Sequence, residues 1–198
     1  IPLDGVAAVV ATVGTTSFAS VDPVRELAER AHAAGAWLHV DAAYAGSSWI
    51  CDEERWSQDG VELADSLVVN PHKWLMLPMD CSLLWTSRPE EFRQAFSLVP
   101  EYLRTPEDVY ALSEYGPALG RRFRSLKLWA VLRCFGAEGL REIQREHIRL
   151  AQLFAELVAA DPAWEPVSPP RCSLLVFRRT GSGGWNPAVT AAQNRLGA

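Results

Sequence analysis

The sequence lacks several features that would assign it to other classes of protein. None of its 198 residues belongs to an apolar run that approaches the ~18 residues of a membrane-spanning helix. A formal net charge of -5 offers no basic surface for nucleic acid or an anionic membrane. The start has no basic stretch followed by an apolar one, which a secretory signal requires. We therefore expect a cytoplasmic protein that binds neither nucleic acid nor a membrane.

Closely spaced cysteines are absent as well. The four cysteines lie far apart and form no CxxC pair, so the sequence favours reduced thiols over a zinc site or a disulfide framework. An initiating methionine and a polar fringe at either end are also missing. These last two absences favour a piece of a longer protein.

Short apolar runs alternate with helical patterns in the first half of the chain. Four such runs predict strands, at residues 6–13, 37–40, 66–69 and 81–86. Between the first two, Asp22 as cap and Pro23 in the first turn predict the start of a helix, and Gly35 predicts its end. Strands that alternate with helices are typical of α/β proteins with a largely parallel sheet.

The second half of the chain is dominated by helical patterns. Apolar residues and one histidine recur at helical spacing and predict a buried helix face, at Leu140, Ile143, His147, Leu150, Phe154 and Leu157. Asp161 and Pro162 end this helix, and residues 172–177 predict a late strand. Residues 100–117 predict a long, functional or mobile loop. We place a domain boundary near residue 125, which separates residues 1–125 from residues 126–198.

Polar side chains follow three successive predicted strands. Thr16 follows the first strand, Asp41 ends the second, and the stretch from Asn70 to His72 and Lys73 follows the third. Ligands of open α/β sheets bind beyond the carboxyl ends of the parallel strands. The sequence therefore predicts a ligand site where these residues meet.

Lys73 and Asp41 have the most informative chemistry of this group. A lysine amine becomes a nucleophile when desolvation or positive charge lowers its pKa, although a lysine here could also be an ordinary surface residue. Asp41 ends an apolar run, where an unpaired carboxylate is costly. It fits the acid that keeps the pyridine nitrogen of pyridoxal phosphate (PLP) protonated, or a metal ligand or helix cap, and His39 could orient it. Thr16 and Asn70 could bind a ligand or close turns.

Four stretches resemble the group II PLP-dependent amino-acid decarboxylases. They occur in the order of that family and span nearly the whole chain: ATVGTT (residues 11–16), HVDAAYAG (39–46), NPHKWL (70–75) and LGRRFRSLK (119–127). The Tyr-Ala-Gly of the second stretch and Trp74 in the third are most similar to the aromatic-L-amino-acid decarboxylases.

This resemblance implies a fold, a reaction and a set of roles. The fold is the type I, aminotransferase-like α/β fold, in which a mostly parallel sheet lies between helices and a smaller C-terminal α+β domain follows, within a homodimer. The reaction is decarboxylation of an aromatic L-amino acid to the amine and CO2. Lys73 would form the Schiff base with PLP, Asp41 would pair with the pyridine nitrogen, and His72 would lie beside the lysine near the phosphate. Further cofactor contacts are implied for Thr16, Asn70 and Ala43.

The chain departs from the family pattern in the loop before residue 119. Family members carry a proton-donating tyrosine eight residues before the glycine of the Leu-Gly-Arg-Arg stretch, where this chain has Leu112, flanked by Tyr110 and Tyr115. Relatives without that tyrosine let oxygen intercept the carbanion, which yields an aldehyde. The sequence therefore leaves open an amine product, an aldehyde product and a non-catalytic segment. It does not identify the amino acid.

Overall fold

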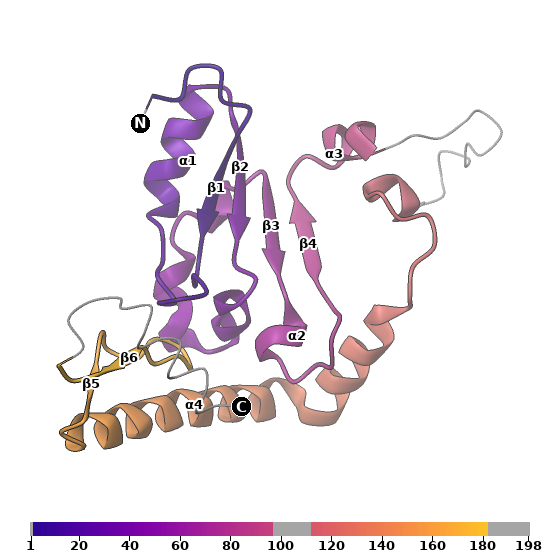
Figure 1. Cartoon of the computed structure of the whole chain (residues 1–198). Coiled ribbons are helices and arrows are strands. Elements are labelled where there is room, and N and C mark those ends of the chain that lie inside the picture. Colours follow the sequence, from indigo (N-terminus) through magenta and orange to yellow (C-terminus); the bar gives the residue numbers. More distant parts are fainter. Residues whose placement is uncertain (1, 97–111, 182–198) are drawn as a thin grey trace.

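A four-stranded sheet forms the centre of the computed structural model, which describes residues 2–96 and 112–181 (Figure 1). The strand order is β1-β2-β3-β4, with β1 at Ala8–Thr12, β2 at Trp37–Asp41, β3 at Ser66–Val69 and β4 at Leu83–Thr86. β1, β2 and β3 are parallel, whereas β4 pairs antiparallel with β3. The prediction of a largely parallel α/β sheet is confirmed.

Helices lie against one face of this sheet and along the edge where its parallel strands end. The α-helices are α1 (Val24–Ala33), α2 (Pro71–Trp74), α3 (Pro89–Phe96) and α4 (Arg124–Ala160). Short 3-10 helices are η1 (Ala45–Ile50), η2 (Asp52–Gln58), η3 (Val61–Leu63) and η5 (Leu112–Tyr115). α4 runs along the edge where β1, β2 and β3 end, and β5 (Trp164–Pro166) and β6 (Phe177–Arg179) form a small antiparallel sheet beside its C-terminal half (Figure 1).

The core lies between α1 and the sheet. Ala28 and Ala31 of α1 and Leu38 and Val40 of β2 are fully buried, and the small alanines let the helix approach the strands closely. Because side chains alternate along a strand, the burial of Leu38 and Val40 directs Asp41 to the opposite face of the sheet.

The start of α1 differs from the sequence prediction. Pro23 occupies the N-cap position, and the helix receives no side-chain cap. The Asp22 carboxylate instead accepts a hydrogen bond from the backbone N–H of Thr12 at 2.7 Å. β1 has no neighbouring strand on this side within the described part of the chain, so Asp22 satisfies a backbone donor of an edge strand.

The buried face of α4 also differs from the prediction. Leu140 is buried as expected, but the other buried residues are Gln144, Ala151 and Val158. Leu150, Phe154 and Leu157 of the predicted face are exposed. The periodicity located the helix and its end at Asp161, but the buried face of α4 includes the polar Gln144 and the small Ala151 in place of several of its larger apolar side chains.

Two further predictions concern the ends of the described ranges. The strand predicted for residues 172–177 is wrong, because β6 begins only at Phe177 and residues 171 and 174 form an isolated bridge. Most of the predicted loop, including Tyr110, lies outside the described residues. Within the described ranges, no helix is both long and apolar enough to cross a membrane.

Candidate cofactor site

Backbone hydrogen bonds join the turns that follow the three parallel strands. Val13 donates to the carbonyl of Asp41 at 2.8 Å, Ala42 donates to Val68 at 3.0 Å, and Asn70 donates to Ala43 at 3.0 Å. These bonds continue the sheet pairing past the strand ends. The structure therefore brings the segments with Thr16, Asp41 and the Asn70–Lys73 group to one edge of the sheet, as predicted.

Small residues allow these turns to pack closely. Gly14 has a φ of +88°, and a Cβ built there would lie 2.6 Å from the Cβ of Ala45. A Cβ at Gly46 would lie 2.6 Å from Cγ2 of Val69. Ala43, which was predicted to pack against a cofactor ring, lies between Gly14 and Gly46 in the sequence. It is buried. The segment from 42 to 46 thus has little room for larger side chains.

Asp41 is half-buried and partly fixed by its own turn. Its Oδ1 accepts a hydrogen bond from the backbone N–H of Ala43 at 3.0 Å. No hydrogen bond to Oδ2 is found within the described residues. His39 does not orient this carboxylate, because its Nδ1 pairs with the Ser66 hydroxyl at 2.8 Å. Burial lowers the pKa of His39, against a smaller raising effect of Asp41, so the imidazole stays neutral at neutral pH and adds no positive charge beside Asp41.

Lys73 lies in the short helix α2 directly after β3. Pro71 occupies the first turn of α2, a position that needs no backbone donor, and the Lys73 N–H bonds to the Asn70 carbonyl at 2.9 Å. The Lys73 side chain is exposed among the described residues.

The side chain of His72 is held by the backbone of Cys81. Its Nδ1 lies 3.0 Å from the Cys81 nitrogen and 2.7 Å from the Cys81 oxygen. The ring accepts from the first or donates to the second according to its tautomer. Cys81 is buried, and its backbone fixes the orientation of His72.

Asn70 and Thr16 retain hydrogen-bonding capacity at the same edge. The side-chain oxygen of Asn70 is buried without a partner among the described residues. The hydroxyl that closes the loop after β1 belongs to Thr15, which accepts the Ser20 N–H at 3.0 Å, whereas Thr16 is exposed. Turn closure is therefore not the role of Thr16.

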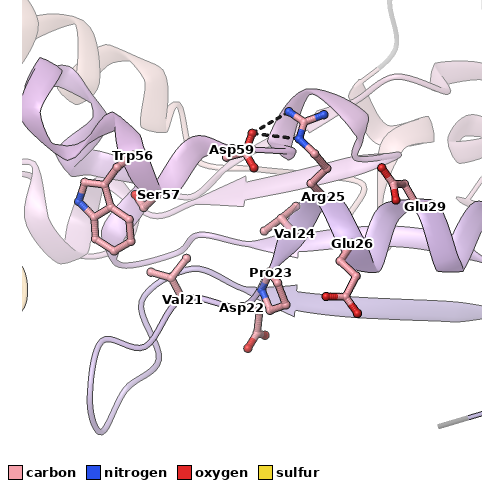
Figure 2. Close-up of a pocket in the computed structure, with 10 residues that line it drawn as sticks. All are labelled: Val21, Asp22, Pro23, Val24, Arg25, Glu26, Glu29, Trp56, Ser57 and Asp59. Carbon is pink, nitrogen blue, oxygen red and sulfur yellow. Dashed lines mark hydrogen bonds and ion pairs between the residues drawn. The ribbon is translucent and has the colours of Figure 1, made fainter.

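A pocket of about 430 Å³ lies elsewhere, at the start of α1 (Figure 2). Asp22, Glu26 and Glu29 line it beside Arg25, which pairs with Asp59 at 2.7 Å. It contains none of the predicted site residues, and within the described ranges no group of acids, histidines and cysteines is arranged to hold a metal ion.

Comparison with known families establishes the family of the chain. The pyridoxal-dependent decarboxylase conserved domain matches residues 4–180. The chain belongs to the pyridoxal-dependent decarboxylase family. Among its relatives, a phenylacetaldehyde synthase of Arabidopsis thaliana is 48% identical over 85% of this chain and 35% of that protein. The aromatic-L-amino-acid decarboxylase of Bos taurus is 44% identical over 94% of this chain and 39% of that protein.

Solved structures of decarboxylases share the fold. The TDC of Oryza sativa, solved with PLP and tryptamine, matches with a TM-score of 0.85 and 40% identity, over 96% of this chain and 40% of that one. The architecture is therefore that of the type I PLP-dependent decarboxylases. The chain spans between 35% and 40% of the length of these three relatives.

The residues at this edge fit the cofactor of the decarboxylase family. Only Oδ1 of Asp41 is bonded to the Ala43 N–H, so Oδ2 can accept a further bond. The side-chain oxygen of Asn70 is buried without a partner among the described residues, and the Lys73 side chain is accessible. Lys73 would attach PLP, Asp41 would hold its ring nitrogen, and Asn70, Thr16 and His72 are placed to contact its polar groups. This assignment of roles stays a prediction.

Sequence reasoning missed the residues that support α2 from outside. Trp74 stacks on Tyr44 with ring centroids 5.3 Å apart, and both Gln144 and His147 of α4 bond to Trp74. His147 was predicted to lie on the buried face of this helix, and it is partly buried with a hydrogen bond from Trp74. No local pattern pointed to Gln144.

Proposed function

We propose that the full-length protein decarboxylates an aromatic L-amino acid to the corresponding amine and CO2, with PLP attached to Lys73. The observation that supports this most directly is the convergence of Lys73 and Asp41 on one sheet edge, in a chain of the pyridoxal-dependent decarboxylase family. The relatives named as aromatic-L-amino-acid and tryptophan decarboxylases support an aromatic substrate.

Asp41, Lys73 and His72 would have separate roles at this edge of the sheet. Bound PLP supplies an electron sink for the pair that remains at Cα when CO2 leaves. Asp41 would keep a proton on the ring nitrogen, because an ionised carboxylate favours a cation beside it. Lys73 would bind the cofactor aldehyde through Nζ and yield it to the substrate amine. His72, fixed by Cys81, would stand beside the lysine as a polar contact.

The proposal is tested by product analysis on the protein in its natural full length. Purified protein with added PLP is given tryptophan, tyrosine, dopa and phenylalanine, and glutamate as a non-aromatic control, and amine and CO2 are quantified. We expect equal amounts of amine and CO2 from at least one aromatic substrate, and none from a folded Lys73→Ala variant. Turnover of glutamate alone would contradict the aromatic assignment.

A second candidate is aldehyde formation at the same site. It is supported by the relative named phenylacetaldehyde synthase and by the similarity to 4-hydroxyphenylacetaldehyde synthase of Rhodiola rosea, which has a TM-score of 0.81 at 35% identity. In this reaction the amino acid, O2 and water give the aldehyde, CO2, ammonia and hydrogen peroxide. Peroxide and ammonia in equal amount to CO2 would establish it, whereas simple decarboxylation yields neither.

The segment between α3 and α4 is the place to look for the proton donor that separates these two products. It holds Tyr102, Tyr110 and Tyr115. Tyr115 belongs to η5, which is tied to α3 by the Arg93–Glu114 ion pair at 2.6 Å. α3 follows the antiparallel β4 and lies at the edge opposite Lys73 (Figure 1).

A Tyr→Phe scan of these three positions tests their role. We expect the variant that removes the donor to shift products from amine toward aldehyde and peroxide. Because of its position, we expect Tyr115→Phe to leave the product ratio unchanged. An unchanged ratio in all three variants would place the donor elsewhere.

We also propose that the protein acts as a homodimer. Large apolar side chains are exposed on the stretch that enters α4, at Leu119, Phe123, Leu126 and Trp129. Several large exposed apolar side chains close together in the sequence favour a surface that binds another chain. Sedimentation of the full-length protein tests this, and a monomer at micromolar concentration would contradict it.

A further inference from the structure

The turn that presents Lys73 is short and needs support from outside itself. α2 has only four residues, too few for a helix to be stable in isolation. On one side of Lys73, His72 is bound to Cys81. On the other side, Trp74 is buried, and two side chains of α4, Gln144 and His147, form hydrogen bonds with it.

Gln144 of α4 joins the two segments that form the candidate cofactor site. Its side-chain amide donates to the Trp74 carbonyl at 2.9 Å and to the Ser47 carbonyl at 3.0 Å. Trp74 directly follows Lys73, and Ser47 lies in η1, which follows the turn of Asp41. With 2% of its surface exposed, Gln144 is a buried side-chain link between the lysine segment and the aspartate segment, in addition to the backbone bond from Asn70 to Ala43.

His147, one turn further along α4, holds the indole of the same tryptophan. The Trp74 Nε1–H donates to Nδ1 of His147 at 3.1 Å, which makes this histidine an acceptor at Nδ1. The indole also stacks on Tyr44 at an interplanar angle of 21°, and the Tyr44 hydroxyl bonds to Ser173 at 2.7 Å. The indole is therefore fixed in both its plane and its rotation.

We propose that Gln144 and His147 are positioning residues that act through Trp74 on Lys73, and thereby set how readily the lysine attaches the cofactor. This inference rests on the proposed function, because it concerns the same site. The two side chains lie on a helix outside the sheet and touch no predicted cofactor contact themselves. Their effect on Lys73 is transmitted through one peptide unit and one indole ring.

The first test compares two neighbouring substitutions on α4 in the full-length protein. Gln144→Met removes both amide donors with little change in volume. Arg145→Met removes the exposed ion pair to Glu53 at 2.6 Å, which also docks α4 but contacts nothing beside Lys73. The readouts are amide hydrogen exchange in residues 73–75 without PLP, and the rate at which borohydride traps PLP on Lys73.

We expect Gln144→Met to speed exchange at Lys73 and Leu75 and to slow trapping by about tenfold or more, since misplacement of a reacting group is costly. We expect Arg145→Met to change both by less than about twofold. Equal values for Gln144→Met and wild type would overturn the proposal. Equal effects of the two substitutions would also overturn it, because they would assign the role to docking of α4 as a whole.

A second, milder set of variants keeps the proposal testable if Gln144→Met does not fold. His147→Leu should slow trapping, and His147→Asn should restore it, because the asparagine oxygen replaces Nδ1 as the acceptor. In a Trp74→Phe background, which lacks the indole donor, His147→Leu should have no further effect. An undiminished effect there would contradict the route through Trp74.

Failure of the proposed function is visible separately. If wild-type protein traps no PLP on Lys73, the proposed function fails. The exchange measurement needs no cofactor and still reports whether Gln144 anchors the turn.

Discussion

The positions of Lys73 and Asp41 at the sheet edge were predictable from the sequence, because each lies at or just after the end of a strand with a clear apolar run. A polar residue at the end of a buried parallel strand faces the ligand edge, and that rule needs no knowledge of distant contacts. The supporting residues were not predictable in this way. Trp74 meets His147 and Gln144 across 73 and 70 residues of sequence, and no local pattern encodes such a pairing. His39 shows the same limit, since its partner is Ser66 on the neighbouring strand and not the adjacent Asp41.

At the scale of single residues, Asp41 offers a test that separates charge from structure. In Asp41→Asn the side-chain oxygen still accepts the Ala43 N–H, which lies 3.0 Å from Oδ1, so the turn is retained while the negative charge is lost. We expect turnover to fall by about 10²–10³-fold, the usual cost of removing one electrostatic stabiliser of the reacting group. Steady-state kinetics at saturating PLP measures this.

The matched control for this residue is the melting temperature. Asp41→Asn should melt within a few degrees of wild type, because the hydrogen bond to the turn remains. Full turnover in the variant would contradict the role of Asp41, and a collapse of the melting temperature would show that its charge serves the fold instead.

At the scale of elements, the strands of the four-stranded sheet agreed with the sequence more closely than the buried face of α4 did. β3 begins and ends where its apolar run does, because a short β-rich run between turn signals has few other ways to fold. The buried face of α4 could not be predicted from its apolar periodicity. Periodicity shows where the apolar side chains lie, whereas α4 docks by donating from Gln144 and by the close approach of Ala151.

The edge of the sheet opposite Lys73 depends on one buried acid. Asp65 is 3% exposed. Its carboxylate accepts hydrogen bonds from the Leu38 N–H at 2.7 Å and from Arg88 at 2.8 Å, and it lies 3.2 Å from Nε2 of His32. It thereby connects β2, α1 and the segment after β4 at the end of the sheet that is remote from the site.

Asp65→Ala should therefore destabilise the fold by about 2 kcal/mol, mainly because the buried Leu38 N–H loses its acceptor. Asp65→Asn should lose less, since its amide oxygen can still accept that bond. The midpoint of urea unfolding measures both. Borohydride trapping at Lys73 in the folded fraction should stay at the wild-type rate, and a large fall in that rate would contradict the separation of the two edges.

At the scale of the whole molecule, the chain contains the lysine and the acid that we propose for a decarboxylase site, and it spans only 35–40% of the length of its relatives. The exposed Lys73 side chain agrees with a site that is completed by further residues. The domain boundary near residue 125 stays a prediction as well, since α4 begins at Arg124 but packs against the turns of the first half.

The central claim is that Lys73 attaches the cofactor, and the chain supplies a suitable internal control. It contains two lysines, Lys73 and Lys127, and Lys127 donates to the Pro78 carbonyl at 2.8 Å. The measurement is borohydride reduction of the full-length protein with PLP, followed by peptide mapping by mass spectrometry. We predict a reduced PLP adduct on the peptide with Lys73, retained in Lys127→Ala and absent from folded Lys73→Ala. An adduct on Lys127 or another lysine, or none at all with PLP in excess, would contradict the claim.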